Sequence, residues 1–280
     1  MHQILLRVPL PGGGYFDIAS YGAMLALGTI FGAVVAMSLG RRDGVAGDTV
    51  IDVVFWAVLG GIVGAKLWYV VQYWGDFPDK WDLLRSFRSG LVYYGGLIGG
   101  VVCVVGYVRH KRLGLLKILD VCAPAAALGL AFGRLGCFLN GCCYGRVTQS
   151  PFGVRFPADS LPFEEQLSSG LVTQADRLSR PVLPSQLFAV AGAISVFVVL
   201  LTLRRTRRFY GEQIALLFVA YSVVRFAEEF SRGDHSPALL GMTAAQVSSI
   251  VIFAAGGLLL TYLRTRRPAG MAVAAPAKKR

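Results

Sequence analysis

Long runs of apolar residues, separated by shorter polar segments, dominate this chain. Seven of the runs are about 20 residues long, which is the length that an α-helix needs to cross the hydrocarbon core of a bilayer. They predict membrane-spanning helices over residues 19–39, 50–73, 90–109, 118–139, 185–203, 212–230 and 243–263. The pattern therefore predicts an all-α polytopic membrane protein.

Two segments depart from this pattern. Residues 140–184 are rich in Pro, Ser and charged residues and predict an extramembrane arm. Residues 268–280, PAGMAVAAPAKKR, are of low complexity and predict a disordered tail. No internal repeat is visible, so we expect residues 1–267 to form a single transmembrane domain. The opening MHQILLRVPLPGGG has no charged start or small-residue cleavage site, so no signal-peptide cleavage is expected.

The composition agrees with a membrane protein, because 55% of the residues are hydrophobic and only 16% are charged. The formal net charge is +12. More than half of the 28 Lys and Arg residues fall in alternate loops and at the C-terminus, which marks the cytoplasmic side. The N-terminus is therefore predicted outside and the C-terminus in the cytoplasm, with the arm on the outer side. Topology accounts for the basic charge, so no nucleic-acid partner is expected.

Polar residues within the predicted spans gather toward one side of the membrane. Arg134 lies about five residues, or roughly 8 Å, from the outer end of its span. Arg225, Glu229 and Arg232 share one helical face near the outer end of the sixth span, and Tyr221 belongs to the same stripe. The other polar residues predicted at this depth are Tyr21, Lys66, Tyr93 and Tyr94. The sequence thus predicts a polar site in the outer leaflet.

The charges of this predicted site favour an anionic ligand. Charged groups in a bilayer cost several kcal/mol each and are normally functional or paired. Arg134, Arg225 and Arg232 outnumber Glu229, and a planar guanidinium suits phosphate. A phospholipid headgroup is the abundant anion in that leaflet, and nearby glycines permit close backbone approach. The alternative is structural: Arg225 pairs with Glu229, and Arg134 extends to the interface.

Histidine and cysteine add little to this site. His2, His110 and His235 do not lie at the predicted depth, so no histidine base is evident unless His235 folds inward. Cys137, Cys142 and Cys143 cluster at the outer boundary, where a disulfide from Cys137 to one of the other two remains open. Their spacing matches no common zinc pattern, and neither a metal nor a cofactor is predicted.

Several motifs, taken in order, resemble those of the bacterial prolipoprotein diacylglyceryl transferase family. GRLGCFLNGCCYG at 133–145 is similar to the family's arginine–asparagine motif, with Arg134, Asn140 and Gly145 on matching positions. YYGGLIGG at 93–100 resembles its HGGLIG segment, and RPVLPSQLF at 180–188 resembles its RPxHPSQLY. YSVVRFAEEFSR matches through Tyr221, Arg225, Glu229 and Arg232, and Tyr21-Gly22 matches a first-span Tyr-Gly.

The resemblance implies a reaction and a set of residues for it. The family moves the diacylglyceryl group of phosphatidylglycerol onto the lipobox cysteine thiol of a preprolipoprotein, forming a thioether and releasing glycerol phosphate in the bacterial plasma membrane. Arg134 and Arg225 are the expected phosphate clamp, and Tyr94 stands at the position of the proposed base. The residues expected to bind or orient substrate are Tyr21, Gly95, Gly96, Asn140, Gly145, Tyr221, Glu229 and Arg232.

Three positions depart from the family pattern. Tyr94 replaces the histidine before GGLIG, and a tyrosine with an ordinary pKa near 10 is a weak base at neutral pH. Cys137 replaces the asparagine after Arg-x-Gly, and Cys142 replaces an acidic residue. These departures suggest a divergent paralogue that uses another acceptor. The buried arginines leave open an anionic-lipid or phosphate transporter, although such a protein usually has repeats and a mid-membrane site. A purely structural or partner-binding membrane protein would leave the convergence of polar residues unexplained.

Overall fold

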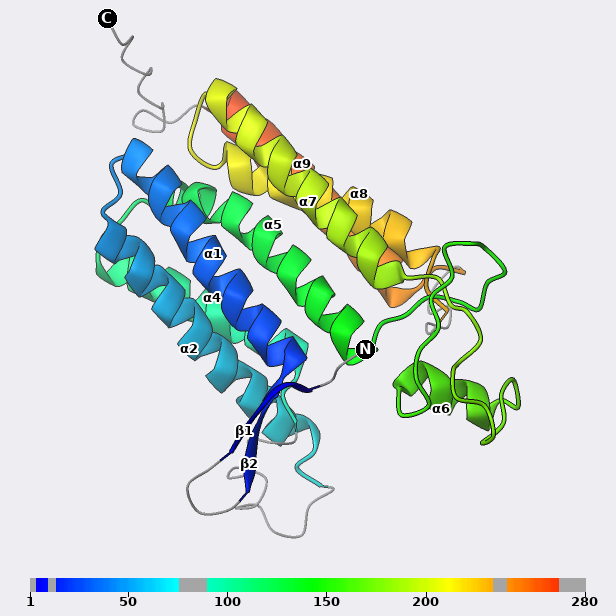
Figure 1. Ribbon diagram of the computed structural model, residues 1–280. Coiled ribbons are helices and arrows are strands. Elements are labelled where there is room, and N and C mark those ends of the chain that lie inside the picture. The colour runs from blue at the N-terminus through cyan, green and yellow to red at the C-terminus, as the bar shows by residue number, and fades with distance from the viewer. Residues whose placement is uncertain (1–3, 10–13, 76–89, 234–240, 267–280) are drawn as a thin grey trace, which may run out of the picture. The chain divides into compact units, whose positions relative to one another are not determined.

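The computed structural model describes residues 4–9, 14–75, 90–233 and 241–266, and these residues are mostly helical. They include α1 (Ser20–Arg42), α2 (Gly47–Gln72), α4 (Tyr93–His110), α5 (Leu115–Asn140), α6 (Leu161–Ser168), α7 (Ser185–Leu203), the 3₁₀ turn η1 (Arg204–Thr206), α8 (Glu212–Glu229) and α9 (Ala244–Arg266) (Figure 1). Each of the seven predicted spans lies on one of the long helices. The predicted tail, 268–280, lies outside the described residues.

Five helices within the described part of the chain are long and apolar enough to cross a membrane. They are Ser20–Arg42, Gly47–Gln72, Leu115–Asn140, Ser185–Thr206 and Ala244–Arg266. The other two predicted spans are the 18-residue helices α4 and α8, which carry more polar residues. Helix α8 contains Arg225, Glu228 and Glu229, and α4 begins with two tyrosines and ends in Arg109–His110. The chain is thus a mostly helical membrane protein, whereas the count of seven membrane spans stays a prediction.

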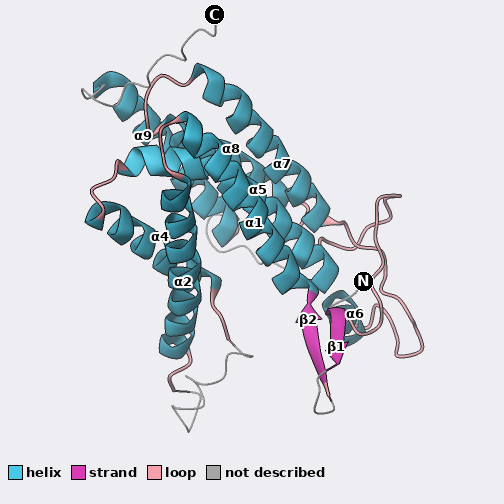
Figure 2. Ribbon diagram, turned by 60° about the vertical axis from the view of Figure 1, so that its left-hand side comes forward, coloured by secondary structure: helices cyan, strands magenta, loops and turns pink. Residues whose placement is uncertain are grey.

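The purely helical prediction needs one correction, because the N-terminus forms a small antiparallel sheet. Strands β1 (Ile4–Pro9) and β2 (Tyr15–Ala19) pair with Leu6 opposite Ile18, and Arg7 forms an exposed ion pair with Asp17 at 2.9 Å (Figure 2). Strands of 6 and 5 residues are far shorter than a membrane span, so the pattern of long apolar runs did not predict them.

The chain divides into two compact units, which are described separately: residues 33–121, and residues 1–32 together with 122–280. In the smaller unit, α2 and α4 run side by side (Figure 2). A Cβ added to Gly64 would lie 2.4 Å from the Gly95 carbonyl oxygen, and one added to Gly99 would lie 2.3 Å from the Gly60 carbonyl oxygen. This Gly-x-x-x-Gly spacing on both helices permits backbone contact, as in many membrane helix pairs.

The larger unit contains the helices that carry the candidate site. Helix α8 packs against both α7 and α9, and small and aliphatic residues of α5, α7 and α8 form a buried core. Figure 1 shows these helices in the upper part of the picture. That core consists of Ala123, Ala127, Val196, Leu200 and Leu217. Ala123 and Ala127 pack the middle of α5 against α7 and α8, and farther along α5 the Arg134 guanidinium lies 3.4 Å from Glu228 of α8. Arg134 is therefore held at a defined position relative to α8.

Residues 141–184 form the segment between α5 and α7. Apart from α6 the segment is irregular, with isolated bridges such as Val154 to Val182. Its buried anchors include Phe156 and Phe163, and the Phe156 amide donates to Ser179 at 2.9 Å. The position of this arm on the outer side of the membrane stays a prediction.

Candidate active site

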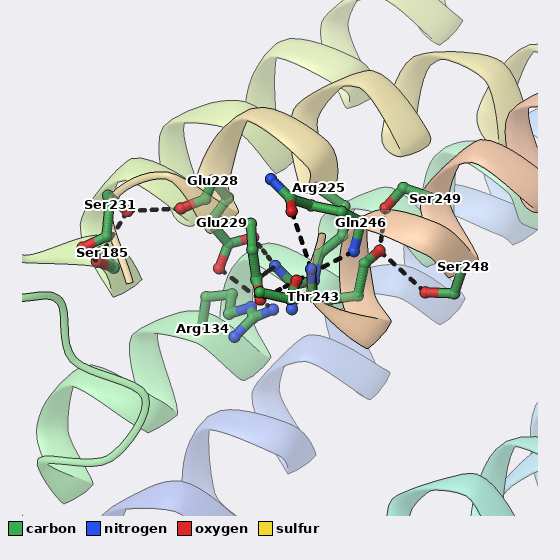
Figure 3. A network of polar contacts seen from close by, with 11 residues as sticks. Arg134, Ser185, Arg225, Glu228, Glu229, Ser231, Thr243, Gln246, Ser248 and Ser249 are labelled. Carbon is green, nitrogen blue, oxygen red and sulfur yellow. Dashed lines mark hydrogen bonds and ion pairs between the residues drawn. The ribbon is translucent and has the colours of Figure 1, made fainter. Parts of the chain in front are cut away.

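An ion-pair network joins α5 to α8 in the larger unit. The Arg225 guanidinium lies 2.6 Å from a Glu229 carboxylate oxygen and 3.8 Å from Glu228. Glu228 also reaches across to Arg134, whose guanidinium lies 3.4 Å away (Figure 3). The two arginines that the sequence predicted to meet therefore do meet, and Glu228 links them.

Glu228 is the residue that sequence reasoning missed. The prediction followed the i, i+4 spacing from Arg225 to Glu229 and counted one acidic residue against three arginines. The i, i+3 spacing from Arg225 to Glu228 also lies on the same helical face and would have found it. The correction matters, because Arg134 and Arg225 now face two carboxylates, and the predicted excess of positive charge around this pair is absent.

The arrangement still presents positive charge, because the acids are the more deeply buried partners. The side chains of Arg134 and Arg225 are 18% and 16% exposed, whereas those of Glu228 and Glu229 are 4% and 1% exposed. The carboxylates thus fix the guanidiniums from within and leave the guanidiniums as the accessible groups. Each guanidinium has five N–H donors, more than these ion pairs use.

The start of α9 supports Glu229 from a third helix. Thr243 and Gln246 form a capping box: the Gln246 amide donates to the Thr243 hydroxyl oxygen at 3.3 Å, and the Thr243 amide donates to Gln246 Oε1 at 3.0 Å. The Thr243 hydroxyl in turn donates to Glu229 Oε1 at 2.6 Å (Figure 3). The T-x-x-Q spacing before an apolar run is the signal in the sequence that could have predicted this cap.

The segment after α8 is tied to the segment after α5. The Ser231 hydroxyl donates to Ser185 Oγ at 2.9 Å, and the Arg146 amide donates to the Ser231 carbonyl at 3.1 Å. Arg232 pairs with Gly145 in an isolated β-bridge. A Cβ on Gly145 would lie 2.4 Å from Ser185 Oγ, so close packing accounts for this glycine.

Tyr21 and Tyr221, two predicted substrate-binding residues, also lie in the larger unit. A Cβ on Gly136 would lie 3.0 Å from the Tyr21 ring, so Tyr21 packs against the face of α5 near its end. Tyr221 is partly buried and packs against the α5–α7–α8 core. Asn140 is the last residue of α5. The roles of these residues, like that of Arg232, stay predictions.

Tyr94, Gly95 and Gly96 belong to the smaller unit. The Tyr94 side chain is exposed and makes an edge-to-face contact with Tyr93 at a centroid distance of 5.7 Å. Gly95 and Gly96 both lie against α2, where a Cβ on Gly96 would approach the Gly61 carbonyl oxygen to 3.2 Å. Helix packing therefore explains both glycines, and their contact with substrate stays a prediction. His235 lies outside the described residues.

Three thiols gather at the end of α5, one from its last turn and two from the residues that follow it. The Sγ atoms of Cys137, Cys142 and Cys143 all lie within 4.8 Å of one another, and all five cysteines of the chain are free, so no Cys137 disulfide is formed. Hydrogen bonds from the other two thiols, together with the charges of Arg232 and Arg134, lower the pKa of the Cys143 thiol. These thiols therefore share the electrostatic environment of the arginine site.

Membrane-length apolar helices around a buried arginine–carboxylate network define a multi-pass membrane protein with a polar site inside its helical domain. The chain belongs to the prolipoprotein diacylglyceryl transferase family, whose sequence pattern matches residues 10–262. Membership confirms the resemblance and the predicted enzyme class.

Individual relatives agree over most of their length. The chain is 31% identical over 256 residues to the phosphatidylglycerol–prolipoprotein diacylglyceryl transferase 2 of Clostridium perfringens, covering 90% of this chain and 94% of the relative. It is 33% identical over 269 residues to the phosphatidylglycerol–prolipoprotein diacylglyceryl transferase of Geobacter sulfurreducens, covering 92% and 95%. A Clostridium tetani enzyme with the same name is 30% identical over 250 residues, covering 89% and 95%.

Proposed function

We propose that this protein transfers the diacylglyceryl group of phosphatidylglycerol to the lipobox cysteine of preprolipoproteins. The cysteine sulfur attacks the glyceryl carbon that carries the phosphate. The carbon–oxygen bond to phosphate breaks, a thioether forms, and glycerol phosphate leaves with the bonding electrons. The thiol proton passes to a base. The family membership and the names of the relatives support this reaction.

The observation that carries the site assignment is the pair of guanidiniums from α5 and α8 that Glu228 joins. The distances from Glu228 are 3.4 Å to Arg134 and 3.8 Å to Arg225, so the two cations are close enough to bind one phosphate. In this proposal they hold the lipid phosphate and stabilise the charge that develops on it as the bond breaks. Glu229, held by Thr243, keeps Arg225 in place.

The remaining assignments rest on the family resemblance. Tyr94 accepts the thiol proton, or the thiolate is captured directly in the positive field of the arginines. Tyr21, Tyr221, Asn140 and Arg232 contact substrate around the clamp. The site faces the outer leaflet of the bacterial plasma membrane, with seven spans, the N-terminus outside and the C-terminus in the cytoplasm. Its partners are phosphatidylglycerol, lipobox signal peptides and the surrounding membrane lipids.

A second candidate is a paralogue that uses the same lipid with another acceptor. The replacements at Tyr94, Cys137 and Cys142 favour it, because they are departures from the family's sequence pattern. It differs from the main proposal only in the acceptor, so a direct assay separates the two.

The test is transfer by the purified protein in mixed micelles that contain phosphatidylglycerol and a lipobox peptide, with mass spectrometry of both. We expect a peptide that gains one diacylglyceryl group on its cysteine. Arg134→Ala and Arg225→Ala should each lower the rate at least 100-fold, because each removes one phosphate-binding cation. Arg134→Lys should also fail, since an ammonium lacks the planar fork. The matched control is Arg7→Ala, which removes an exposed arginine of the hairpin.

The outcomes separate the candidate functions. Consumed lipid with unmodified peptide would move the assignment to the paralogue. Unconsumed lipid that crosses between leaflets of proteoliposomes would move it to a transporter. Normal transfer by both alanine variants would remove the arginine clamp while leaving the reaction itself in place.

A further inference from the structure

A helix cap brings the three clustered thiols together. At the end of α5 the Gly141 amide donates to the Phe138 carbonyl at 3.3 Å, and the Cys142 amide donates to the Cys137 carbonyl at 3.1 Å. Gly141 has φ +77°, so the two bonds form a Schellman motif with a left-handed glycine. This motif normally places the side chains of the residues that correspond to Cys137 and Cys142 in contact.

Cys143 completes the cluster because its own backbone is also left-handed, with φ +59°. Two left-handed residues within three positions turn the chain back over the last turn of α5. A non-glycine residue in this region is uncommon and carries a conformational cost. The turn therefore brings three sulfur atoms within 4.8 Å of one another.

We propose that Cys137, Cys142 and Cys143 form a binding site for a thiophilic d¹⁰ metal ion of the Cu(I) and Zn(II) class. Metal–thiolate bonds of about 2.3 Å place the sulfurs of a three-thiolate site about 4 Å apart, close to the spacing already present. Binding forms three metal–sulfur bonds and releases the thiol protons to solvent. All three donors are sulfur, which selects soft ions over Mg²⁺ or Ca²⁺.

The surroundings provide balancing charge and a route of access. Arg134 and Arg232 lie near enough to act electrostatically on Cys143, and their charges offset the excess negative charge of three thiolates around one cation. Cys143 also lines a surface pocket of about 400 Å³ together with Glu164 and Glu165 of α6, and these acidic groups attract cations to its mouth.

Gln186 offers a second contact beside the cluster. It is fully buried and donates to the Cys142 carbonyl at 2.8 Å, which fixes the turn from α7. Its Oε1 has no hydrogen-bond partner among the described residues. A buried acceptor of this kind normally has a hydrogen-bond partner, such as an ordered water. A Zn(II) ion held by three thiolates would carry a water as its fourth ligand, and that water could donate a hydrogen bond to Gln186 Oε1.

The arrangement favours a metal site over a simple disulfide. A disulfide joins two sulfurs at about 2.05 Å and leaves the third thiol unused, whereas here the three sulfurs are gathered together. The proposal is independent of the transferase reaction, since it concerns metal binding and not turnover.

The experiment uses the full-length protein, purified in detergent under anaerobic reducing conditions and then freed of reductant. Zn(II) and Cu(I) are titrated separately, with bound metal measured by mass spectrometry and thiolate-to-metal charge-transfer absorption followed in the ultraviolet. We expect one ion per chain. Cys137→Ser, Cys142→Ser and Cys143→Ser should each weaken binding at least tenfold, and a Cys103→Ser/Cys122→Ser double variant is the control that should bind like the wild type.

A second measurement uses only the wild-type protein, so its result does not depend on whether the cysteine variants fold. X-ray absorption of the metal-loaded wild-type protein should show three sulfur neighbours at about 2.3 Å. Oxygen or nitrogen neighbours alone, or binding that survives all three substitutions, would overturn the proposal. So would a protein that binds neither ion while its three thiols react freely, or a separate preparation made without reductant in which two of the three cysteines are joined in a disulfide.

Discussion

Neutralising Glu228 is the sharpest perturbation of the proposed site. Glu228→Gln keeps the size of the side chain and a hydrogen-bond acceptor but removes the charge that Arg134 and Arg225 share. We expect both the stability of the larger unit and transfer to fall, because two guanidiniums would then face one carboxylate in a poorly hydrated site. A role in orientation alone would affect transfer without this loss of stability.

The size of the effect follows from the distances. At an effective dielectric constant of about 20, charges at the Glu228–Arg134 and Glu228–Arg225 separations attract by about 5 and about 4 kcal/mol respectively. Burying the carboxylate offsets much of this, and breaking one member of a buried pair typically costs about 3–5 kcal/mol. Because the glutamine still accepts a hydrogen bond and the guanidiniums are partly exposed, we expect a loss of about 3 kcal/mol, near the lower end.

The assay is unfolding in mixed micelles with increasing SDS, followed by circular dichroism. Asp17→Asn is the matched control, because it removes the acid of an ion pair that is shorter but exposed, at 2.9 Å with side chains 62% and 43% exposed. An exposed pair contributes about 0–1 kcal/mol, so the two losses should differ clearly. A double-mutant cycle with Arg134→Gln should give less than the sum of the single losses.

Two results would contradict this account. Equal losses for Glu228→Gln and Asp17→Asn would mean that the burial of Glu228 has no energetic consequence. Strict additivity with Arg134→Gln, within about 0.5 kcal/mol, would mean that the 3.4 Å ion pair is not an energetic link between α5 and α8.

The remaining predictions concern packing, capping and proton transfer. Gly99→Val should prevent stable folding of the smaller unit, because the new Cβ would lie 2.3 Å from the Gly60 carbonyl oxygen. Gly106→Val is the control and should be tolerated, because a Cβ at Gly106 meets nothing within 4 Å. Equal expression and equal SDS resistance of the two variants would contradict this prediction. Thr243→Val should cost about 1–2 kcal/mol, since it removes a cap and the hydrogen bond to a buried glutamate; an unchanged SDS midpoint would disprove it. Tyr94→Phe should slow transfer about 100-fold if the hydroxyl accepts the thiol proton, and unchanged turnover would end that role.

The sequence predicted the helices and the meeting of the arginines because both depend on strong local patterns. Apolar runs of membrane length have few alternatives to a helix, since a bilayer requires every backbone group to be paired within the segment. The helical spacing of Arg225 and Glu229 placed both on one face of α8, where they form the 2.6 Å ion pair. Arg134 lies on another helix, and it was predicted to meet Arg225 because the predicted topology places both residues at a similar depth in the membrane.

What the sequence did not reveal depends on contacts between distant segments. Glu228 and Thr243 become part of the site only when α5, α8 and α9 pack together. For Arg225, the i, i+4 spacing to Glu229 was considered, whereas the i, i+3 spacing to Glu228 was not. Gly95 and Gly96 of α4 were treated as possible substrate contacts, because a glycine near a predicted site has the same sequence signal whether it approaches a ligand or another helix. The short N-terminal strands carry no pattern of membrane length.

The cap at the end of α5 changes how two departures from the family pattern are understood. The family has an asparagine at the position of Cys137 and an acidic residue at that of Cys142, and in the sequence these replacements look independent. In the structure they occupy the two positions that a Schellman motif places in contact, joined by the Cys142 to Cys137 backbone bond of 3.1 Å. The cap thus brings two thiols together on a turn that Gly141 makes with its left-handed backbone. Because the cap depends on backbone groups and on Gly141, it can keep its geometry while the side chains change their chemistry. Arg134, one turn before Cys137 on α5, is held separately by its ion pair with Glu228 at 3.4 Å, so the proposed thiol site and the proposed arginine clamp use different side chains.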